Sequence, residues 1–390
     1  MARLYLKPGV ERRLKNVYLW VFNNQVAAVE DLTENGDIVE VFSSKNRPVG
    51  VGYYNRHSLI SVRMLSFGPQ EIPPDFFRDR ITRALERRTT LLPGCSACRL
   101  VYSEADLLPG LIVDRYDRFL SVQALTMGMD RLTERILPDL IETLKPSGIV
   151  LRNDSPFRAR EGLDQYVRVA YGEVPEIVEI VENDARFGVD LRRGQKTGFF
   201  FDQRTNRHIC RSLSRGRRVL DCFSYSGGFS INAALGGAVS VLAVDESADA
   251  LALVTDNAAR NGLESIVDTR KADCFDLLRS LFTAGERFDL IVLDPPAFVK
   301  SKEKLAEAVR GYKEINLSAM KLLNPGGILI TCSCSYQLSP VDFLNTITAA
   351  ARDARRLCHV RSLSGQAEDH PVLLTMPETQ YLKCAVLEFL

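Results

Sequence analysis

Two polar side chains, those of Asp294 and Cys334, follow apolar segments that are typical of buried strands. Asp294 comes directly after Phe288–Leu293, and Cys334 lies near the end of an apolar, β-branched run that starts after Gly326-Gly327. Open α/β sheets bind ligands at the carboxyl ends of their strands. We therefore expect these two residues to end neighbouring strands, about 5 Å apart, where a carboxylate and a thiol could hold one substrate. Each feature alone is also common in purely structural strands.

The two cysteines of this run have different expected roles. Cys332 and Cys334 are two residues apart, so their side chains point to the same face of an extended strand. Cys334 is nearer to the carboxyl end, where a ligand would bind. Cys334 is therefore the thiol that could hold a substrate together with Asp294. Cys332 lies one pleat deeper, and we expect it in the core.

Three further acidic residues end successive predicted strands. Asp221 precedes a turn of small residues that includes Ser224 and Gly227, where a ligand could approach backbone N–H groups at a helix N-terminus. Its carboxylate suits a cationic ammonium group. Asp245 ends the next strand and could hold two ribose hydroxyls. Asp273 ends a third strand, where it could meet an adenine amino group.

The turn after Asp221 departs from a dinucleotide-binding motif. Phe223 and Tyr225 occupy two positions that glycine holds in a Gly-x-Gly-x-Gly loop. Pyrophosphate needs a close approach of the backbone at such positions, so a cofactor without phosphates fits better. S-adenosylmethionine matches the series of ammonium, ribose and adenine. A structural α/β domain with acids at these positions by coincidence is the alternative.

Composition sets the broad class of the protein. The chain has 390 residues, 46% hydrophobic and 25% charged, which is ordinary for a globular protein of two or three domains. It contains no apolar run that could span a membrane, and its first residues lack the apolar core of a signal peptide. We expect a cytoplasmic protein without a membrane partner, whose nine cysteines are thiols. Cys95 and Cys98 have no second pair of ligands nearby, so we expect no metal site.

The pattern along the chain predicts distinct domains. Residues 1 to about 70 contain short strands separated by turns, which favours a small barrel. Residues 1–90 hold 14 Lys and Arg against 10 Asp and Glu, a net charge of +4. Such a module could contact a polyanion such as RNA, although an ordinary solvated surface explains the charge equally well. From about residue 215 strands alternate with helices, which predicts a parallel, doubly wound sheet.

The ordered set of these motifs resembles the class I, PUA-containing ribosomal RNA cytosine-5 methyltransferases, of the large-subunit methyltransferase I type. The resemblance covers essentially the whole chain and implies an α/β fold with three parts. These are a PUA-like RNA-binding β-barrel (1–75), a small central α/β domain (76–175) and a Rossmann-like, S-adenosylmethionine-dependent methyltransferase domain that begins with a hairpin (176–390). The motifs that carry the resemblance are Gln195–Arg204, Asp221–Phe229, Asp245, Asp273, Asp294-Pro295-Pro296 and Ser333-Cys334-Ser335.

This resemblance implies that a methyl group passes from S-adenosylmethionine to C5 of a cytosine in RNA, expected to be large-subunit ribosomal RNA. Cys334 would form a covalent adduct at C6, and Asp294 would engage the cytosine edge. Ala297 stands where related enzymes can carry a second cysteine, so the base that removes the C5 proton is not identified. The residues expected to bind the cofactor are Thr197, Gln203, Arg204, Asp221, Ser224, Gly227, Asp245, Asp273 and Asp294.

Two other functions stay open at this point. Asp-Pro-Pro motifs also serve methylation of a purine nitrogen or an exocyclic amine, which needs no nucleophile. A PUA-bearing RNA-binding protein with an inactive methyltransferase domain is the second alternative, and the full set of cofactor acids argues against it. The sequence decides neither the target nucleotide nor whether the protein forms a homodimer.

Overall fold

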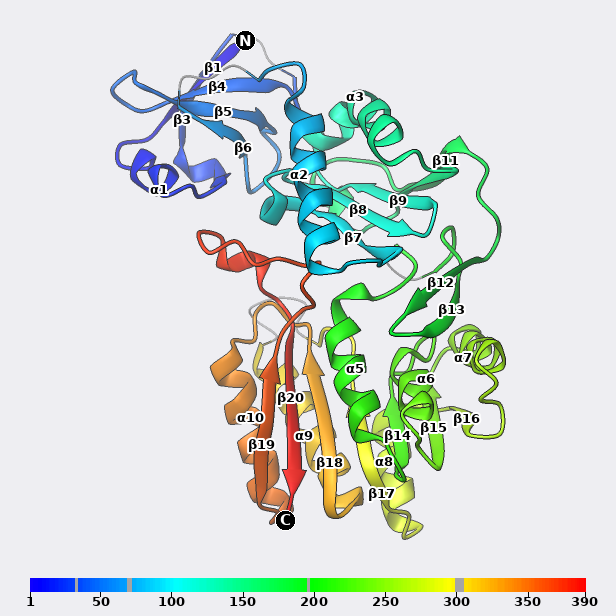
Figure 1. Cartoon of the computed structure of the whole chain (residues 1–390). Coiled ribbons are helices and arrows are strands. Elements are labelled where there is room, and N and C mark those ends of the chain that lie inside the picture. The colour runs from blue at the N-terminus through cyan, green and yellow to red at the C-terminus, as the bar shows by residue number, and fades with distance from the viewer. Residues whose placement is uncertain (32–33, 69–71, 195–196, 299–304) are drawn as a thin grey trace. The chain divides into compact units, whose positions relative to one another are not determined.

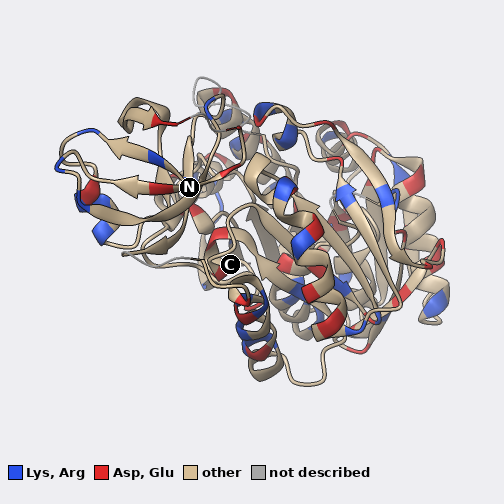
Figure 2. Ribbon diagram, turned by 90° about the horizontal axis from the view of Figure 1, so that it is seen from above, with Lys and Arg blue, Asp and Glu red and all other residues tan. Residues whose placement is uncertain are grey.

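The structure is a computed structural model that describes residues 1–390 except 32–33, 69–71, 195–196 and 299–304 (Figure 1). The chain forms two compact units. The first comprises Met1–Ile180, Val189–Phe201 and Glu368–Thr379, and the second comprises Val181–Gly188, Asp202–Ala367 and Gln380–Leu390. Basic and acidic residues are interspersed along the chain (Figure 2), in keeping with a net charge of +1.

The N-terminal part, where the sequence predicts the barrel, is a six-stranded sheet in the order β2-β6-β5-β4-β1-β3. Its alternating apolar residues, such as Leu4 and Leu6, lie in a buried core. Gly50 permits close pairing of β5 with β6, because an added Cβ would lie 2.1 Å from the Ser66 carbonyl oxygen. The elements are β1 (Ala2–Leu6), α1 (Glu11–Lys15), β2 (Trp20–Val21), η1 (Asn23–Gln25), β3 (Val26–Glu30), β4 (Ile38–Phe42), β5 (Pro48–Tyr54) and β6 (Val62–Phe67).

A second sheet of the first unit has five strands in the order β11-β10-β9-β8-β7. Tyr53 of β5 and Leu65 of β6 pack into the same core as α2 and this sheet, so the two sheets share apolar contacts. The elements are α2 (Phe76–Leu91), β7 (Ala97–Tyr102), η2 (Ser103–Asp106), β8 (Leu111–Tyr116), β9 (Phe119–Ala124), α3 (Met127–Leu144), β10 (Gly148–Asn153), α4 (Phe157–Arg160) and β11 (Tyr166–Gly172).

A two-stranded hairpin follows, formed by β12 (Val178–Glu182) and β13 (Ala185–Val189). Asn183 and Asp184 make the turn with φ angles of 51° and 62°. Asn and Asp tolerate this left-handed region better than other residues with a side chain. A hairpin in this part of the chain was predicted from the sequence and is confirmed.

The second unit is built on a seven-stranded sheet in the order β16-β15-β14-β17-β18-β20-β19, with β18, β20 and β19 side by side in Figure 1. The helical elements are η3 (Phe201–Gln203), α5 (Arg204–Leu213), α6 (Gly228–Leu235), α7 (Ala248–Arg260), α8 (Cys274–Thr283), α9 (Leu305–Leu322) and α10 (Pro340–Ala354). The strands are β14 (Arg218–Cys222), β15 (Ser240–Asp245), β16 (Val267–Lys271), β17 (Phe288–Leu293), β18 (Leu323–Ser333), β19 (Cys358–Ser364) and β20 (Lys383–Phe389). A short η5 (Pro377–Thr379) belongs to the first unit.

Strands β14 to β18 are parallel, which confirms the predicted α/β sheet. Apolar runs such as Leu290–Leu293 are fully buried, as expected for parallel strands covered on both faces. The last strand, β20, departs from the purely parallel expectation, because it inserts antiparallel between β18 and β19. The predicted domain boundaries at residues 75 and 175 stay predictions. No helix within the described residues has the length and hydropathy that a membrane span requires.

Candidate active site

Asp294 and Cys334 follow neighbouring strands, as predicted. Leu293, the last residue of β17, pairs with Thr331 of β18, and β18 continues two residues further to Ser333. The Cys334 sulfur lies 3.9 Å from the carbonyl oxygen of Pro295, which directly follows Asp294. The thiol therefore lies beside the segment that carries the carboxylate.

The two cysteines of β18 differ in exposure. Cys332 is fully buried, whereas Cys334 is partly exposed. A hydrogen bond with Cys384 on β20, together with burial, raises the pKa of Cys332 well above its ordinary value. Cys332 is therefore a neutral core thiol, which confirms its predicted place in the core.

A buried amide holds the Asp294 carboxylate in position. Gln203 donates from Nε2 to Oδ1 of Asp294 at 2.9 Å. The other end of the same amide, Oε1, accepts a hydrogen bond of 2.6 Å from Asn206 on α5. Because both ends of the Gln203 amide are bound, its donor is aimed at Asp294.

Asp221 at the end of β14 is a buried carboxylate with one occupied oxygen. Its Oδ2 accepts a hydrogen bond of 2.6 Å from the Ser230 hydroxyl on α6. Its Oδ1 is buried and has no hydrogen-bond partner among the residues that the structure describes. Burial raises the pKa of Asp221 to about 7, and the charges of Asp294 and Asp245 add to the increase. An unsatisfied buried carboxylate oxygen is a suitable site for a cationic ligand.

The turn between β14 and α6 has an unusual backbone. Phe223, Tyr225 and Gly227 have φ angles of 65°, 47° and 81°. The left-handed region costs a residue with a side chain ~1–2 kcal/mol, and such strain is concentrated at functional sites. Phe223 and Tyr225 thus adopt conformations that glycine would supply in a Gly-x-Gly-x-Gly loop. The Ser224 hydroxyl in this turn is buried and, within the described ranges, unpaired.

Asp245 at the end of β15 supports the same turn. Its two carboxylate oxygens accept hydrogen bonds from the backbone N–H groups of Tyr225 and Ser247, each at 2.9 Å. Each carboxylate oxygen has a second lone pair, so these bonds leave acceptor capacity for ribose hydroxyls. Asp245 therefore links the end of β15 to the strained turn after β14.

Asp273 begins a helix and lies beside a residue that sequence reasoning missed. Its Oδ1 accepts from the N–H of Asp276 at 2.9 Å and caps α8. A hydrogen bond with Asp273 is the largest cause that raises the pKa of Glu246. Glu246 follows Asp245 directly, and this adjacency is the only signal of its place that the sequence contains.

Thr197 and Arg204 each contact an acidic side chain of the protein. Thr197, in the first unit, is buried, donates to Asp114 and accepts from the Tyr116 hydroxyl. Arg204, in the second unit, forms an ion pair with Glu182, with 3.9 Å between Nη2 and Oε2. Their predicted contacts with the cofactor stay predictions. Gln195 and Lys196, near the start of the same predicted motif, lie outside the described residues.

Two polar residues that sequence reasoning missed, Tyr312 and Lys383, contact the chain directly after Cys334. The Ser335 hydroxyl lies 2.9 Å from that of Tyr312 on α9, and its N–H donates to the Ser333 hydroxyl at 3.3 Å. The Ser335 carbonyl accepts from the ammonium of Lys383 on β20 at 2.6 Å. Three atoms of Ser335 are therefore held by hydrogen bonds.

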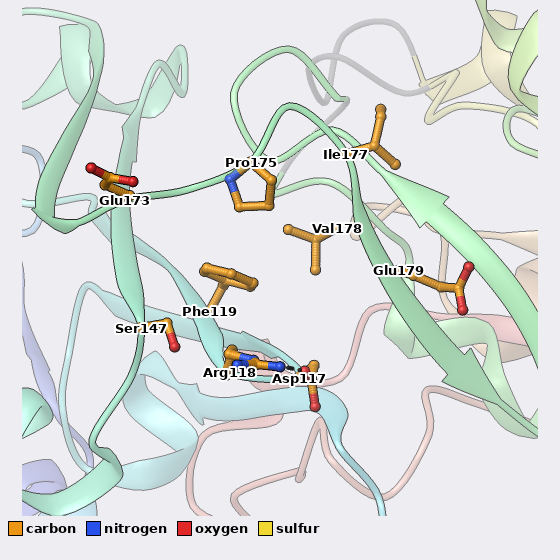
Figure 3. A pocket seen from close by; sticks show the side chains of 9 residues that line it. All are labelled: Asp117, Arg118, Phe119, Ser147, Glu173, Pro175, Ile177, Val178 and Glu179. Carbon is orange, nitrogen blue, oxygen red and sulfur yellow. Dashed lines mark ion pairs between the residues drawn. The ribbon is translucent and has the colours of Figure 1, made fainter.

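A pocket of about 410 Å³ in the first unit is lined by nine residues, none of them predicted for the site (Figure 3). Phe119, Pro175 and Val178 form much of its apolar lining, and Arg118 pairs with Asp117 at 3.6 Å on its rim. These residues suggest no catalytic chemistry.

Comparison with known proteins decides the family. Residues 130–376 match the family model of S-adenosylmethionine-dependent methyltransferases, and residues 4–67 match that of a PUA-like domain. The chain is 41% identical over 387 residues to ribosomal RNA large subunit methyltransferase I of Shewanella denitrificans, covering 98% of each protein. It belongs to the ribosomal RNA large subunit methyltransferase I family. The same enzyme of Aeromonas salmonicida is 41% identical over 391 residues, again with 98% of each covered.

Solved structures show the same fold for this methyltransferase. A putative SAM-dependent methyltransferase from Streptococcus mutans superposes with a TM-score of 0.85 over the whole of both chains, at 21% identity. A putative methyltransferase complexed with SAH gives a TM-score of 0.87 at the same identity and coverage. The predicted fold class, with a PUA-like domain and a Rossmann-like methyltransferase domain, is confirmed.

The cofactor of this methyltransferase is S-adenosylmethionine, as its family shows. The residues present fit this group. The buried Oδ1 of Asp221 and the buried hydroxyl of Ser224, both without partners among the described residues, are hydrogen-bonding groups that a ligand could satisfy.

Proposed function

We propose that this methyltransferase modifies C5 of a cytosine in large-subunit ribosomal RNA, with Cys334 as the nucleophile. The observation that carries the proposal is the partly exposed Cys334 thiol beside the Asp294 segment, at the carboxyl ends of β17 and β18. The names of the relatives support ribosomal RNA as the substrate.

The proposed chemistry uses Cys334 to activate the base. Cytosine C5 is a weak nucleophile, and addition of the thiolate to C6 places an electron pair on C5. S-adenosylmethionine, when bound, supplies an electrophilic methyl group. After C5 carries the methyl group, loss of the C5 proton to a base restores the double bond and expels the thiolate from C6. The target nucleotide must leave its stack before Cys334 can reach it.

Asp294 is proposed to engage the hydrogen-bonding edge of the cytosine while the adduct forms. Its orientation by Gln203 supports this role, because a carboxylate held in one position loses less entropy when it binds the base. Ala297 has no proton-accepting group, so it cannot remove the C5 proton.

The cofactor assignments follow from the ends of three strands. Asp221 is proposed to hold the ammonium group, Asp245 the ribose hydroxyls and Asp273 the adenine amino group. Small residues of the strained turn would let the cofactor approach the backbone. The remaining residues proposed to contact the cofactor are Thr197, Gln203, Arg204, Ser224, Gly227 and Asp294.

Contact of the N-terminal barrel with RNA is the second part of the proposal. Residues 4–67 match a PUA-like domain, and residues 1–90 carry a net charge of +4. Basic groups bind RNA by neutralising its phosphates. The barrel would therefore strengthen binding, and the second unit would carry the chemistry.

The nature of the modified nucleoside tests this function. The protein is incubated with unmodified large-subunit ribosomal RNA and a methyl-labelled donor, and the digested RNA is analysed by mass spectrometry. We expect labelled 5-methylcytidine. Label on a purine, or on an exocyclic amine, would overturn the cytosine-5 proposal and favour methylation without a nucleophile. RNA without label would contradict ribosomal RNA as the substrate.

A further inference from the structure

The ammonium of Lys383 is buried next to the proposed nucleophile. Lys383 begins β20 and pairs in register with Ser333 of β18, one residue before Cys334. Its side chain is largely buried, and Nζ donates to the carbonyl oxygens of Ser335 at 2.6 Å and Tyr381 at 2.8 Å. Lys383 thus holds the backbone of Ser335, the residue that follows Cys334.

The printed contacts of this ammonium within the described part of the chain are with neutral acceptors. Among the residues that the structure describes, no carboxylate forms an ion pair with Lys383, and the acceptors of its Nζ are neutral carbonyl groups. A buried charge without a counter-charge is costly. Burial accordingly lowers the pKa of Lys383 to about 8, whereas the charged form of Cys334 opposes that decrease. A thiolate at Cys334 would supply the missing negative charge.

We propose that Lys383 is the positioning residue of the Cys334 site, where its ammonium fixes the backbone after Cys334 and stabilises the thiolate electrostatically. The inference rests on the proposed role of Cys334 as the nucleophile. A nearby ammonium favours the thiolate, which is the reactive form of cysteine. Lys383 thereby prepares the thiol before RNA arrives.

Four other described groups near Cys334 do not supply this positive charge, namely Tyr312, Asp294, Cys332 and Cys384. The hydroxyl of Tyr312 on α9 shares a hydrogen bond with that of Ser335, the residue after Cys334, and burial raises the pKa of Tyr312, so its hydroxyl stays neutral. The charge of Asp294 contributes to the raised pKa of Cys332 and therefore opposes ionisation of that thiol. Cys332 stays protonated, since its hydrogen bond with Cys384 and its burial raise its pKa.

The pH dependence of Cys334 alkylation tests the inference without RNA or cofactor. The folded full-length protein is treated briefly with iodoacetamide at pH 5.5 to 10, and the modified Cys334 peptide is measured by mass spectrometry. We expect wild-type Cys334 to titrate below the ordinary thiol pKa of about 8.5. Lys383→Met should raise the apparent pKa of Cys334 by about one unit or more, which lowers its alkylation rate at pH 7 about tenfold.

Two controls separate the electrostatic effect from damage to the fold. Lys383→Arg keeps the positive charge and should retain most of the wild-type profile. Cys358 is also partly exposed and pairs with Phe389 at the opposite end of β20, so its profile should not change in either variant. If Lys383→Met leaves the apparent pKa of Cys334 unchanged, the inference is overturned. It is also overturned if Lys383→Arg raises this pKa as much as Lys383→Met does.

The alkylation result is independent of the identity of the methylated nucleoside. If RNA is methylated at a position other than cytosine C5, the proposed function fails while the alkylation profile can still show the Lys383 effect. If 5-methylcytidine forms but Lys383→Met leaves the Cys334 profile unchanged, only the role of Lys383 fails.

Discussion

The Ser230 hydroxyl donates a hydrogen bond of 2.6 Å to Oδ2 of Asp221, while Oδ1 of the same carboxylate has no partner among the described residues. The hydrogen bond from Ser230 therefore orients the Asp221 carboxylate, so that Oδ2 is bound within the protein and Oδ1 is available to a ligand. The charge of Asp221 is buried, and a bound cation would offset the cost of that burial. This arrangement gives the first two predictions.

Replacement of the Asp221 carboxylate should weaken cofactor binding strongly. Asp221→Asn keeps the shape of the side chain and an acceptor for Ser230 but removes the negative charge. Hydrogen bonds to charged groups contribute ~1.5–3 kcal/mol, so affinity for S-adenosylmethionine at pH 7.5 should fall about 10-fold to 100-fold. Calorimetry measures this change, and Asp256→Asn on the exposed side of α7 is the matched control. Equal affinity of Asp221→Asn and the wild type would exclude Asp221 as the ammonium ligand.

Cofactor affinity should rise with pH because Asp221 must ionise. Burial raises the pKa of Asp221 to about 7, so the carboxyl is largely protonated at pH 5.5 in the cofactor-free protein. Affinity should increase between pH 5.5 and 7.5, a range below the ordinary α-amino pKa of ~7.7–8.0. Calorimetry across this range should show the increase for the wild type and a much flatter profile for Asp221→Asn. If the affinity of both proteins changes equally with pH, the pH dependence belongs to another group.

The same raised pKa has a consequence for stability. The pKa of Asp221 is higher in the folded protein than in the unfolded chain, where it is about 3.9. The contribution of this group to stability is therefore fully present below about pH 3.9 and is lost as the pH rises through about 7. Asp221→Asn should accordingly gain thermal stability relative to the cofactor-free wild type as the pH rises from 5 to 8.

Loss of the Asp245 carboxylate should affect both cofactor binding and stability. Asp245→Ala removes the proposed ribose acceptor and also leaves the N–H groups of Tyr225 and Ser247 without their partner. Each lost hydrogen bond costs ~0.5–1.5 kcal/mol, so the unfolding temperature should fall by a few degrees. Calorimetry and thermal melts measure the two effects, with the exposed Asp249→Ala as control. A lower unfolding temperature with unchanged affinity for S-adenosylmethionine would show that Asp245 stabilises the fold but does not bind the ribose.

Cys334→Ser should abolish methyl transfer and leave cofactor binding unchanged. A serine hydroxyl is far less ionised than a thiol at neutral pH, so it cannot add readily to C6. RNA with 5-fluorocytidine at the target should trap the wild-type protein covalently, because fluorine does not leave as a proton does. Gel electrophoresis detects the adduct. Cys332→Ser, a nearly isosteric change at the buried neighbour, should keep substantial activity. Near wild-type methylation by Cys334→Ser would rule out the covalent mechanism.

Charge reversal on the barrel should weaken RNA binding. Arg12 and Lys15 are exposed on α1, and Arg12→Glu combined with Lys15→Glu should lower RNA affinity and reduce its salt dependence. Filter binding at several salt concentrations measures both quantities. Point substitutions are preferable to removal of the barrel, because Tyr53 and Leu65 share a core with the central sheet.

The matched control for this experiment lies at the opposite end of the methyltransferase sheet from the proposed site. Lys321 and Arg352 are exposed near the C-terminal ends of α9 and α10, which lead back to the amino ends of the strands. Reversal of both charges should change RNA affinity little. If the control pair weakens binding as much as the barrel pair, the effect comes from total charge and the barrel has no special role.

The sequence predicted elements whose signals are local. The strand Phe288–Leu293 was predicted with the bounds that the structure has, because a largely apolar run defines it. The carboxyl-edge positions of Asp221 and Asp245 followed from the alternation of strands and helices, since parallel strands present their ends at one edge. Sequence similarity then showed the family and confirmed the cofactor that the series of acids predicted.

Contacts between distant parts of the chain were decided only by the tertiary structure. Lys383 lies 48 residues after Ser335, and the antiparallel insertion of β20 beside β18 brings them together. Likewise, the positive φ angles of Phe223 and Tyr225 depend on the packing of the turn, because neither residue favours that conformation by itself. Local patterns determine which segments form strands, whereas the free energy of packing the whole chain determines which side chains meet at their ends.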